Sequence, residues 1–176
     1  MKVSKAILND SDIKETELTE TSASRFTTSL ASLRRGRGME KRVVIAVGST
    51  DRIQSIINEA IQINDALQEN DLLIVPVIIE PPSGTIKPLP TEIDMDTLPD
   101  CIALPATGAT SGSWKIVITD EMEEAMKQDI NVYDDGFCVI LKKNGRVGQR
   151  TRGIYLSNMV GDVTQRREAG MDVVNI

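Results

Sequence analysis

The sequence predicts an α/β protein with one domain over residues 41–174. Residues 41–80 contain two apolar runs joined by an amphipathic segment, which is typical of a strand, a helix and a strand. Residues 135–153 contain Asn144-Gly145 between two strand-like segments, and this dipeptide is the strongest short signal of a β-hairpin. Together these stretches predict a sheet with parallel and antiparallel pairs and with helices on both faces.

The first stretch is typical of a parallel βαβ unit. Residues 43–47 form a continuous apolar run, as expected of a strand that is buried on both faces. Ser49 or Thr50 can cap the helix that follows by accepting a backbone N–H, and residues 72–79 form the second strand. Pro76 lies inside that strand and cannot donate a ladder hydrogen bond. We therefore expect this strand at a sheet edge, or a bulge in it.

Residues 81–113 are predicted to be an irregular, proline-rich insertion, which is often functional when it interrupts a compact domain. After it, residues 114–118 (WKIVI) alternate like a strand, and we expect a helix to begin at Asp120. Residues 136–141 and 147–152 then form the hairpin, with a type I′ turn between them. A short amphipathic helix with a basic end completes the domain.

This order of elements is that of the thioredoxin-like fold, but the redox residues of that fold are missing. In such folds a nucleophilic cysteine begins the helix after the first strand, where the helix dipole lowers its pKa. Residues 48–51 read Gly-Ser-Thr-Asp instead. A proline normally faces the thiol, and the matching residues here are Asp134, Asp135 and Gly136. The sequence therefore predicts a thioredoxin-like scaffold with no catalytic residue.

The composition excludes several classes of function. The net charge of -6 and the pI of about 4.8 disfavour general nucleic-acid binding, which needs clustered Lys and Arg. The chain has no histidine, which excludes Ser-His and Cys-His nucleophilic sites and His-ligated zinc. The longest apolar run, residues 72–79, is shorter than the roughly 20 residues that a membrane-spanning helix needs. We expect no cofactor, no metal and no transmembrane segment.

Residues 1–40 are predicted to be a flexible, partly basic arm. Within it, the spacing of Phe26, Leu30 and Leu33 fits either one helical turn that docks on a partner or a solvated tail. On an exposed hairpin strand, alternate residues share one face, so the arginines after the turn lie together if no bulge intervenes. The predicted partner-binding residues are Arg34, Arg35, Arg37, Arg146, Arg150 and Arg152.

Two explanations of the hairpin arginines carry equal weight. A row of guanidinium groups suits bidentate contact with carboxylates of a partner or with acidic lipid headgroups. Charged residues on an edge strand also protect it from aggregation.

The two cysteines offer an alternative class of function. Cys138 lies mid-strand among apolar residues, so we expect it to be a small buried residue. Cys101 lies in the proline-rich segment, where it would be exposed enough for a thiol-based redox enzyme or sensor. A third option is a small-anion site at the helix start of Ser49 and Thr50.

Two runs, WKIVITDEMEEAMKQ (114–128) and DDGFCVILKKNGRVGQRTRG (134–153), resemble the C-terminal soluble region of the LOW PSII ACCUMULATION 1 family. The similar elements are a Trp-led strand, an acidic helix start, and a hairpin turn followed by arginines. Members of that family are photosystem II assembly and repair factors of thylakoid membranes. They carry tetratricopeptide repeats and transmembrane helices that this sequence lacks, so membrane anchoring is not carried over.

The resemblance implies a chloroplast or cyanobacterial setting. It implies a location in the stroma or at the stromal surface of thylakoids, which is their cytoplasmic side in a cyanobacterium. The predicted function is accordingly a non-catalytic interaction module, an assembly factor or peripheral subunit of a photosystem complex. The partner would be a membrane protein complex and not a nucleic acid.

Overall fold

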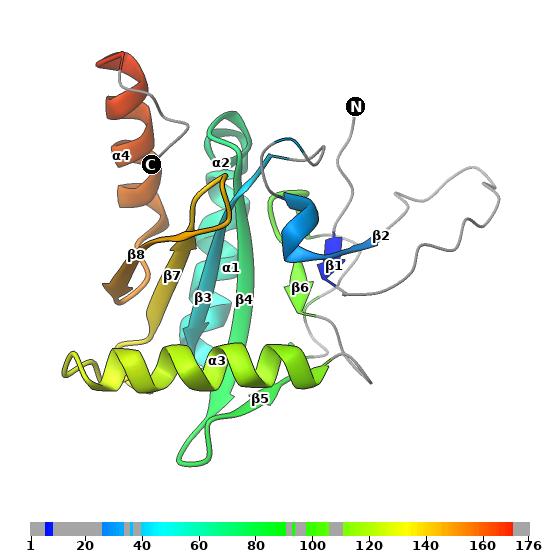
Figure 1. The fold of residues 1–176 in the computed structure, drawn as a ribbon, viewed down its shortest axis with the longest axis vertical. Helices are drawn as coiled ribbons and strands as arrows, with labels where there is room; N and C mark the ends of the chain where they lie inside the picture. Colours follow the sequence, from blue (N-terminus) through cyan, green and yellow to red (C-terminus); the bar gives the residue numbers. More distant parts are fainter. Residues whose placement is uncertain are drawn as a thin grey trace, which may run out of the picture.

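A computed structural model describes residues 6–8, 26–33, 36, 40–90, 93, 98–105 and 111–170, and it confirms the predicted α/β class (Figure 1). The helices are η1 (Leu30–Leu33, a 3-10 helix), α1 (Thr50–Gln62), α2 (Asn64–Glu69), α3 (Ser111–Met126) and α4 (Leu156–Glu168). The main sheet contains, in spatial order, β5 (Thr85–Lys87), β4 (Leu72–Glu80), β3 (Arg42–Gly48), β7 (Phe137–Leu141) and β8 (Val147–Arg152). A small parallel sheet has the order β2 (Phe26–Thr28), β1 (Ala6–Leu8) and β6 (Leu104–Pro105).

The predicted βαβ unit and the predicted hairpin are both confirmed. β3 pairs in parallel with β4, and α1 and α2 connect them, while β7 pairs antiparallel with β3 and with β8. All seven residues of β3 are buried, as its continuous apolar run predicts. Ser49 occupies the N-cap position of α1 as predicted, but its side chain makes no capping hydrogen bond. The narrower thioredoxin-like assignment stays a prediction.

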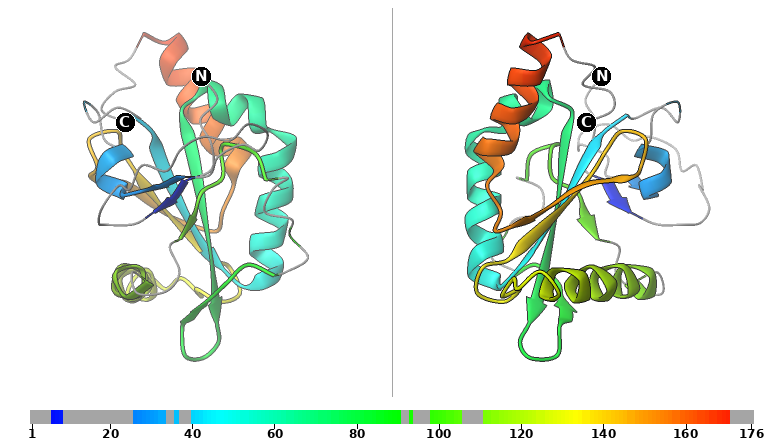
Figure 2. Two further views of the ribbon diagram at one scale, coloured as in Figure 1. Left: turned by 90° about the vertical axis from the view of Figure 1, so that its right-hand side faces the viewer. Right: turned by 60° about the vertical axis from the view of Figure 1, so that its left-hand side comes forward.

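The sheet separates two apolar cores, because successive strand residues point to opposite faces. Val43, Ile45 and Val47 pack with α3 and η1, whereas Val44 and Ala46 pack with α1, α2 and α4. The right-hand view of Figure 2 shows α1 and α4 on one side of the sheet and α3 and η1 on the other. The molecule therefore has three layers, with the sheet in the middle.

Pro76 is accommodated without a bulge. The register of β3 and β4 is continuous through the pair of Ala46 and Pro76. Ile74 accepts from the N–H of Ala103 and donates to the carbonyl of Cys101, so its backbone polar groups face away from β3. Pro76 lies two residues further on and therefore has its nitrogen on the same outer side. β4 is not the edge strand that we expected, but β5 begins to pair only at Ile78, so the missing N–H leaves no ladder bond unmade.

The predicted strand at residues 114–118 is wrong, and so is the helix start at Asp120. Both lie inside the single helix α3. Trp114, Ile118 and Met122 are buried at intervals of four residues, which is the period of a helix. A run as short as WKIVI fits both periods, so the burial of the longer segment decides between them.

Part of the predicted irregular segment has regular structure. β5 returns along the end of β4, and Ile102 forms a parallel bridge with Ile74. Leu98 and Ile102 are buried against the α1 side of the sheet. α3 begins at Ser111, which lies before the predicted end of the segment.

The hairpin turn differs from the type I′ turn that we predicted. Of Asn144 and Gly145, Gly145 alone has a positive φ, 79°. Its N–H donates to the carbonyl of Lys142 at 2.7 Å, and Lys142 in turn donates to Arg146 at 2.9 Å. This is a type I turn followed by a left-handed glycine, the usual form of a slightly longer hairpin loop.

Leu33 packs in the protein's own core, beside the residues of α3 that face the sheet. For this residue, neither of the two alternatives, a turn that docks on a partner or a solvated tail, holds. Lys41 donates to the carbonyl of Leu33 at 2.9 Å, which ties η1 to the start of β3. In the described part of the chain, no helix combines the length and the apolar character that crossing a bilayer requires.

Candidate functional site

The turn between β3 and α1 packs against the loop that precedes β7. The backbones of Gly48 and Gly136 pass close together: a Cβ atom on Gly48 would lie 3.7 Å from the Cα of Gly136. Arg52, in the first turn of α1, donates from Nε to the carbonyl of Asp134 at 3.2 Å. The place where a thioredoxin-like enzyme holds its reactive group is thus closed by backbone and by one arginine.

Both cysteines are buried. Cys138 is on β7 as predicted, and its Sγ lies 2.8 Å from the hydroxyl of Thr151. The prediction that Cys101 is exposed is wrong, since its exposed fraction is 2%. Burial raises the pKa of the Cys101 thiol to about 12 and that of the Cys138 thiol to about 11. Because the thiolate is the reactive form, neither residue is activated as a nucleophile.

Native protein at pH 8 should resist iodoacetamide at both thiols, while both should react readily in urea. We expect the native rate to be at least about 100-fold lower, since a raised pKa and burial both remove accessible thiolate. Intact-mass spectrometry over time measures the rate of alkylation. The Cys101→Ser variant shows which of the two thiols has reacted. Native labelling of Cys101 at the rate seen in urea would instead support the redox-sensor alternative.

The hairpin arginines do not form the predicted row. Gln149 pairs with Ile140 and Val147 with Leu141, so Gly148 is an extra residue that forms a bulge. The bulge shifts the alternation by one residue. Arg146 therefore lies off the face that Arg150 and Arg152 share.

Two of these arginines form ion pairs within the protein. Arg150 holds Glu121 of α3 through two hydrogen bonds, at 2.6 and 3.0 Å. Arg152 pairs with Asp135 at 3.0 Å, although 66% of its side chain is exposed. The remaining predicted residues, Arg34, Arg35 and Arg37, lie outside the described residues.

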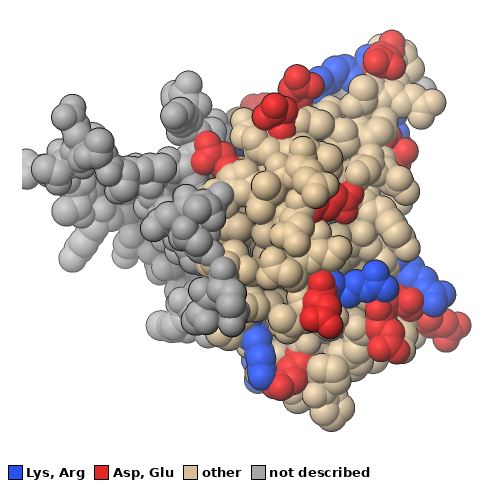
Figure 3. All heavy atoms as spheres, turned by 180° about the vertical axis from the view of Figure 1, so that it is seen from behind, with Lys and Arg blue, Asp and Glu red and all other residues tan. Residues whose placement is uncertain are grey.

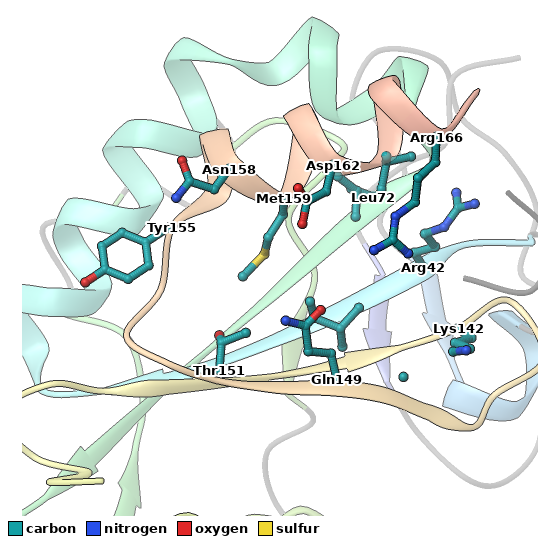
Figure 4. Close-up of a pocket in the computed structure, with 13 residues that line it drawn as sticks. Arg42, Leu72, Lys142, Gln149, Thr151, Tyr155, Asn158, Met159, Asp162 and Arg166 are labelled. Carbon is teal, nitrogen blue, oxygen red and sulfur yellow. The ribbon is translucent and has the colours of Figure 1, made fainter. Parts of the chain in front are cut away.

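A pocket of about 410 Å³ lies between α4 and the sheet (Figure 4). Its floor comes from the starts of β3 and β4 and from the hairpin, and its wall is one side of α4. The side chains that line it from α4 and its N-cap are Tyr155, Asn158, Met159, Asp162, Val163 and Arg166. Those that line it from the sheet include Arg42, Leu72, Ile140, Lys142, Gln149 and Thr151.

One end of the pocket is cationic. Figure 4 shows Arg42, Arg166 and Lys142 at this end, with Met159 in the middle and Tyr155 at the other end. Arg42 is 3% exposed and donates from Nη1 to the carbonyl of Asn70 at 3.1 Å. Burial, together with the charge of Arg167, lowers the pKa of Arg42, and Asp71 opposes the shift.

Asp71 lies near this end of the pocket but forms its ion pairs with two lysines outside the pocket lining. It pairs with Lys143 at 2.7 Å and with Lys41 at 3.5 Å. Burial opposes its ionisation, but the hydrogen bonds and charges of Lys143 and Lys41 outweigh this, so the pKa of Asp71 lies below its ordinary value. Its charge is therefore largely balanced by these two lysines.

This pocket was not predicted from the sequence. Arg42 and Arg166 are far apart in the chain, and only the packing of α4 over the sheet brings them to one pocket. In the described residues, no three His, Cys, Asp or Glu side chains form a group that could hold a metal ion.

Comparison with known proteins adds no assignment. No family model, no curated protein and no solved structure matches the chain.

Proposed function

We propose that the protein is a non-catalytic interaction module that docks through the edge strand β8. The observation that carries this proposal is the edge of the main sheet, where β8 is the last strand and no described residue pairs with its outer side. Gly153 donates to the carbonyl of Gly136 at 2.9 Å, so residues 149, 151 and 153 direct their backbone groups toward β7. Arg150 and Arg152 alternate with them and direct theirs outward. An extended segment of a partner can add to such an edge as a further strand.

The charge of this edge specifies the partner. Arg146 and Arg152 are exposed near the two ends of β8, and the exposed side chain of Val147 lies between them. Guanidinium groups bind carboxylates in a bidentate geometry, so we propose an extended acidic segment as the docking partner. The face seen from behind in Figure 3 is a poorer candidate, because its charged side chains surround a mostly uncharged middle.

A redox enzyme or sensor that uses Cys101 is a weaker candidate function than an interaction module. A thiol enzyme or sensor needs an accessible thiol of lowered pKa, whereas this thiol is buried and its pKa is raised. The edge strand β8 and the burial of both thiols therefore favour an interaction module.

The finer proposal is that the partner is a photosystem complex at the stromal surface of thylakoids, with the protein as an assembly factor or peripheral subunit. The resemblance of residues 114–128 and 134–153 to the photosystem II assembly family supports it. One element of that resemblance, the Trp-led strand, is helical in this protein, so the hairpin and its arginines carry the remaining similarity.

Capture of partners from detergent-solubilised thylakoid membranes tests both the docking through β8 and the photosystem complex as the partner. The tagged protein should retain photosystem subunits, and Arg146→Glu with Arg152→Glu should reduce their recovery by about tenfold or more, because two attractive charges become repulsive. Lys115→Glu with Lys127→Glu is the matched control, since it makes the same change of charge on α3 and just after its last residue.

The outcomes distinguish failure of the photosystem partner from failure of docking through β8. Retention of another protein with the same dependence on Arg146 and Arg152 would contradict the photosystem partner and keep the docking edge. Equal recovery with both double variants, or recovery of the protein only as a soluble monomer, would overturn the docking proposal itself.

A further inference from the structure

We propose that the pocket between α4 and the sheet binds a free amino acid with an apolar side chain. This inference goes beyond the docking function, because it concerns a small molecule and a different surface from the edge of β8. Two features of the pocket carry it. An acidic and a basic side chain line it one helical turn apart, and an apolar section lies next to them. An amino acid presents an ammonium, a carboxylate and a side chain in the matching arrangement.

The acidic and the basic side chain are Asp162 and Arg166. Both line the pocket from α4, and Figure 4 shows both extending from the helix toward the sheet. Residues four apart on a helix are neighbours, and an acid and a base in these positions commonly pair with each other. In the described part of the chain, neither side chain forms an ion pair or a hydrogen bond, with the other or with any third residue. Both charges are therefore free to bind one ligand.

The two charges are complementary to those of an amino acid. The guanidinium of Arg166 suits a carboxylate, which it binds through two parallel hydrogen bonds. The carboxylate of Asp162 has two acceptor oxygens for the N–H groups of an ammonium. Hydrogen bonds between ionised groups are stronger than those between neutral groups. A zwitterion would satisfy both side chains at once and add no net charge to the pocket.

The other charged groups near this end are not assigned to the ligand. Arg42 and Lys142 line the pocket, but each already interacts within the protein. Asp71 is likewise paired with Lys41 and Lys143. The proposed ligand needs none of them, because its two opposite charges are both met from α4.

The apolar section lies beside Asp162. Leu72 and Ile140 line it from the sheet, and Met159 and Val163 line it from α4. The volume of the whole pocket, about 410 Å³, is within the range of roughly 300–1,000 Å³ that is typical of small-molecule sites. Burial of an apolar side chain against these residues removes it from water, which favours binding.

The order of the lining residues along α4 sets the orientation of the ligand. Arg166, Asp162 and Met159 follow one another toward the N-terminal end of the helix, where Tyr155 is the N-cap. At 1.5 Å per residue, Met159 lies about 4.5 Å from Asp162 along the helix axis, and Tyr155 about 10 Å. A carboxylate at Arg166 and an ammonium at Asp162 thus direct the ligand's side chain past Met159 toward Tyr155. An aromatic side chain suits this path, because thioether sulfur and aromatic rings both pack favourably against aromatic rings.

Four probes test the proposal: L-phenylalanine, N-acetyl-L-phenylalanine, L-phenylalaninamide and glycine. The acetyl compound lacks the ammonium and the amide lacks the carboxylate, so each should bind at least about fivefold more weakly than L-phenylalanine. Glycine keeps both charges but has no apolar side chain, and it should bind at least about tenfold more weakly. Titrations followed by amide chemical shifts on the full chain measure both affinity and place. The perturbed residues should be those of β8 and α4 that line the pocket.

Two single variants should each remove one part of this selectivity. Asp162→Asn should weaken L-phenylalanine by about three- to tenfold and make the acetyl compound bind about equally well. Arg166→Gln should weaken L-phenylalanine similarly but make the amide bind about equally well. Asp120→Asn on α3 and Arg146→Gln at the hairpin turn are the matched controls, since they make the same changes outside the pocket. Each control should change the affinity by less than about twofold.

Several results would overturn the proposal. Equal affinities for L-phenylalanine and either of its two derivatives would show that one of the charges is not recognised. Glycine that bound as tightly as L-phenylalanine would show that the apolar section is not used. Chemical shift changes outside the pocket, or equal effects of a pocket variant and its matched control, would place binding elsewhere. Because the wild-type comparison of the four probes uses no variant, loss of folding in a variant cannot rescue or sink the result.

Discussion

Ile118→Ala should lower the free energy of unfolding by about 2–5 kcal/mol, whereas Ile116→Ala should change it by less than about 0.5 kcal/mol. The two substitutions remove the same atoms from the same helix. Ile118 is 1% exposed and packs against the sheet, while Ile116 is 65% exposed. The difference arises because α3 turns Ile118 inward and Ile116 outward, and a cavity forms only at the buried position.

Urea unfolding followed by the fluorescence of Trp114 measures both values. Trp114 is the single tryptophan of the chain and is buried against the same core, so its emission should report the loss of this packing. If residues 114–118 were a strand, Trp114, Ile116 and Ile118 would share one face. Similar costs for the two isoleucines would therefore contradict the helix.

Gly136→Ala should cost about 1–3 kcal/mol of stability or more, while Gly161→Ala should increase stability by about 0.5–1 kcal/mol. Gly136 has a φ of 66°, a left-handed conformation that L-residues with a Cβ adopt at a cost. An added Cβ would also lie 3.0 Å from the carbonyl oxygen of Val47, which belongs to backbone and cannot turn away.

Gly161 is the internal control for this experiment. It lies inside α4, where nothing stands within 4 Å of an added Cβ. Alanine there reduces the conformational freedom of the unfolded chain without new strain. Denaturant midpoints of the two variants should therefore move in opposite directions from that of the parent. A neutral Gly136→Ala would show that the close approach of β7 to the end of β3 is not required.

The sequence predicted best where the signals are local. The continuous apolar run at residues 43–47 predicted β3, and the apolar stripe that follows it predicted α1. Both patterns of apolar residues can be recognised within a short window of sequence. Asn144-Gly145 located the hairpin turn, although the loop is longer than the two-residue type that we expected. The length of that loop depends on how β7 and β8 are paired, which no dipeptide specifies.

Prediction failed where one inserted residue or a distant contact decides the outcome. Gly148 forms a bulge and moves Arg146 off the shared face, and Glu121 binds Arg150 from α3. We predicted that Cys101 is exposed because the segment around it is rich in proline. The backbone of this segment instead forms hydrogen bonds with Ile74, which places the side chain of Cys101 in the core. For Arg150 and Cys101 the decisive partner is remote in sequence.

The sequence by itself determined the α/β class, the βαβ unit, the hairpin and the absence of a thiol at the helix start, because these follow from residue types in short windows. Only the tertiary structure decided that residues 114–118 are helical, that the thiols are closed to solvent, and that Arg42 and Arg166 share one pocket. The physical reason is that burial and charge proximity depend on which surfaces pack together, and the residues that meet there are far apart in the sequence.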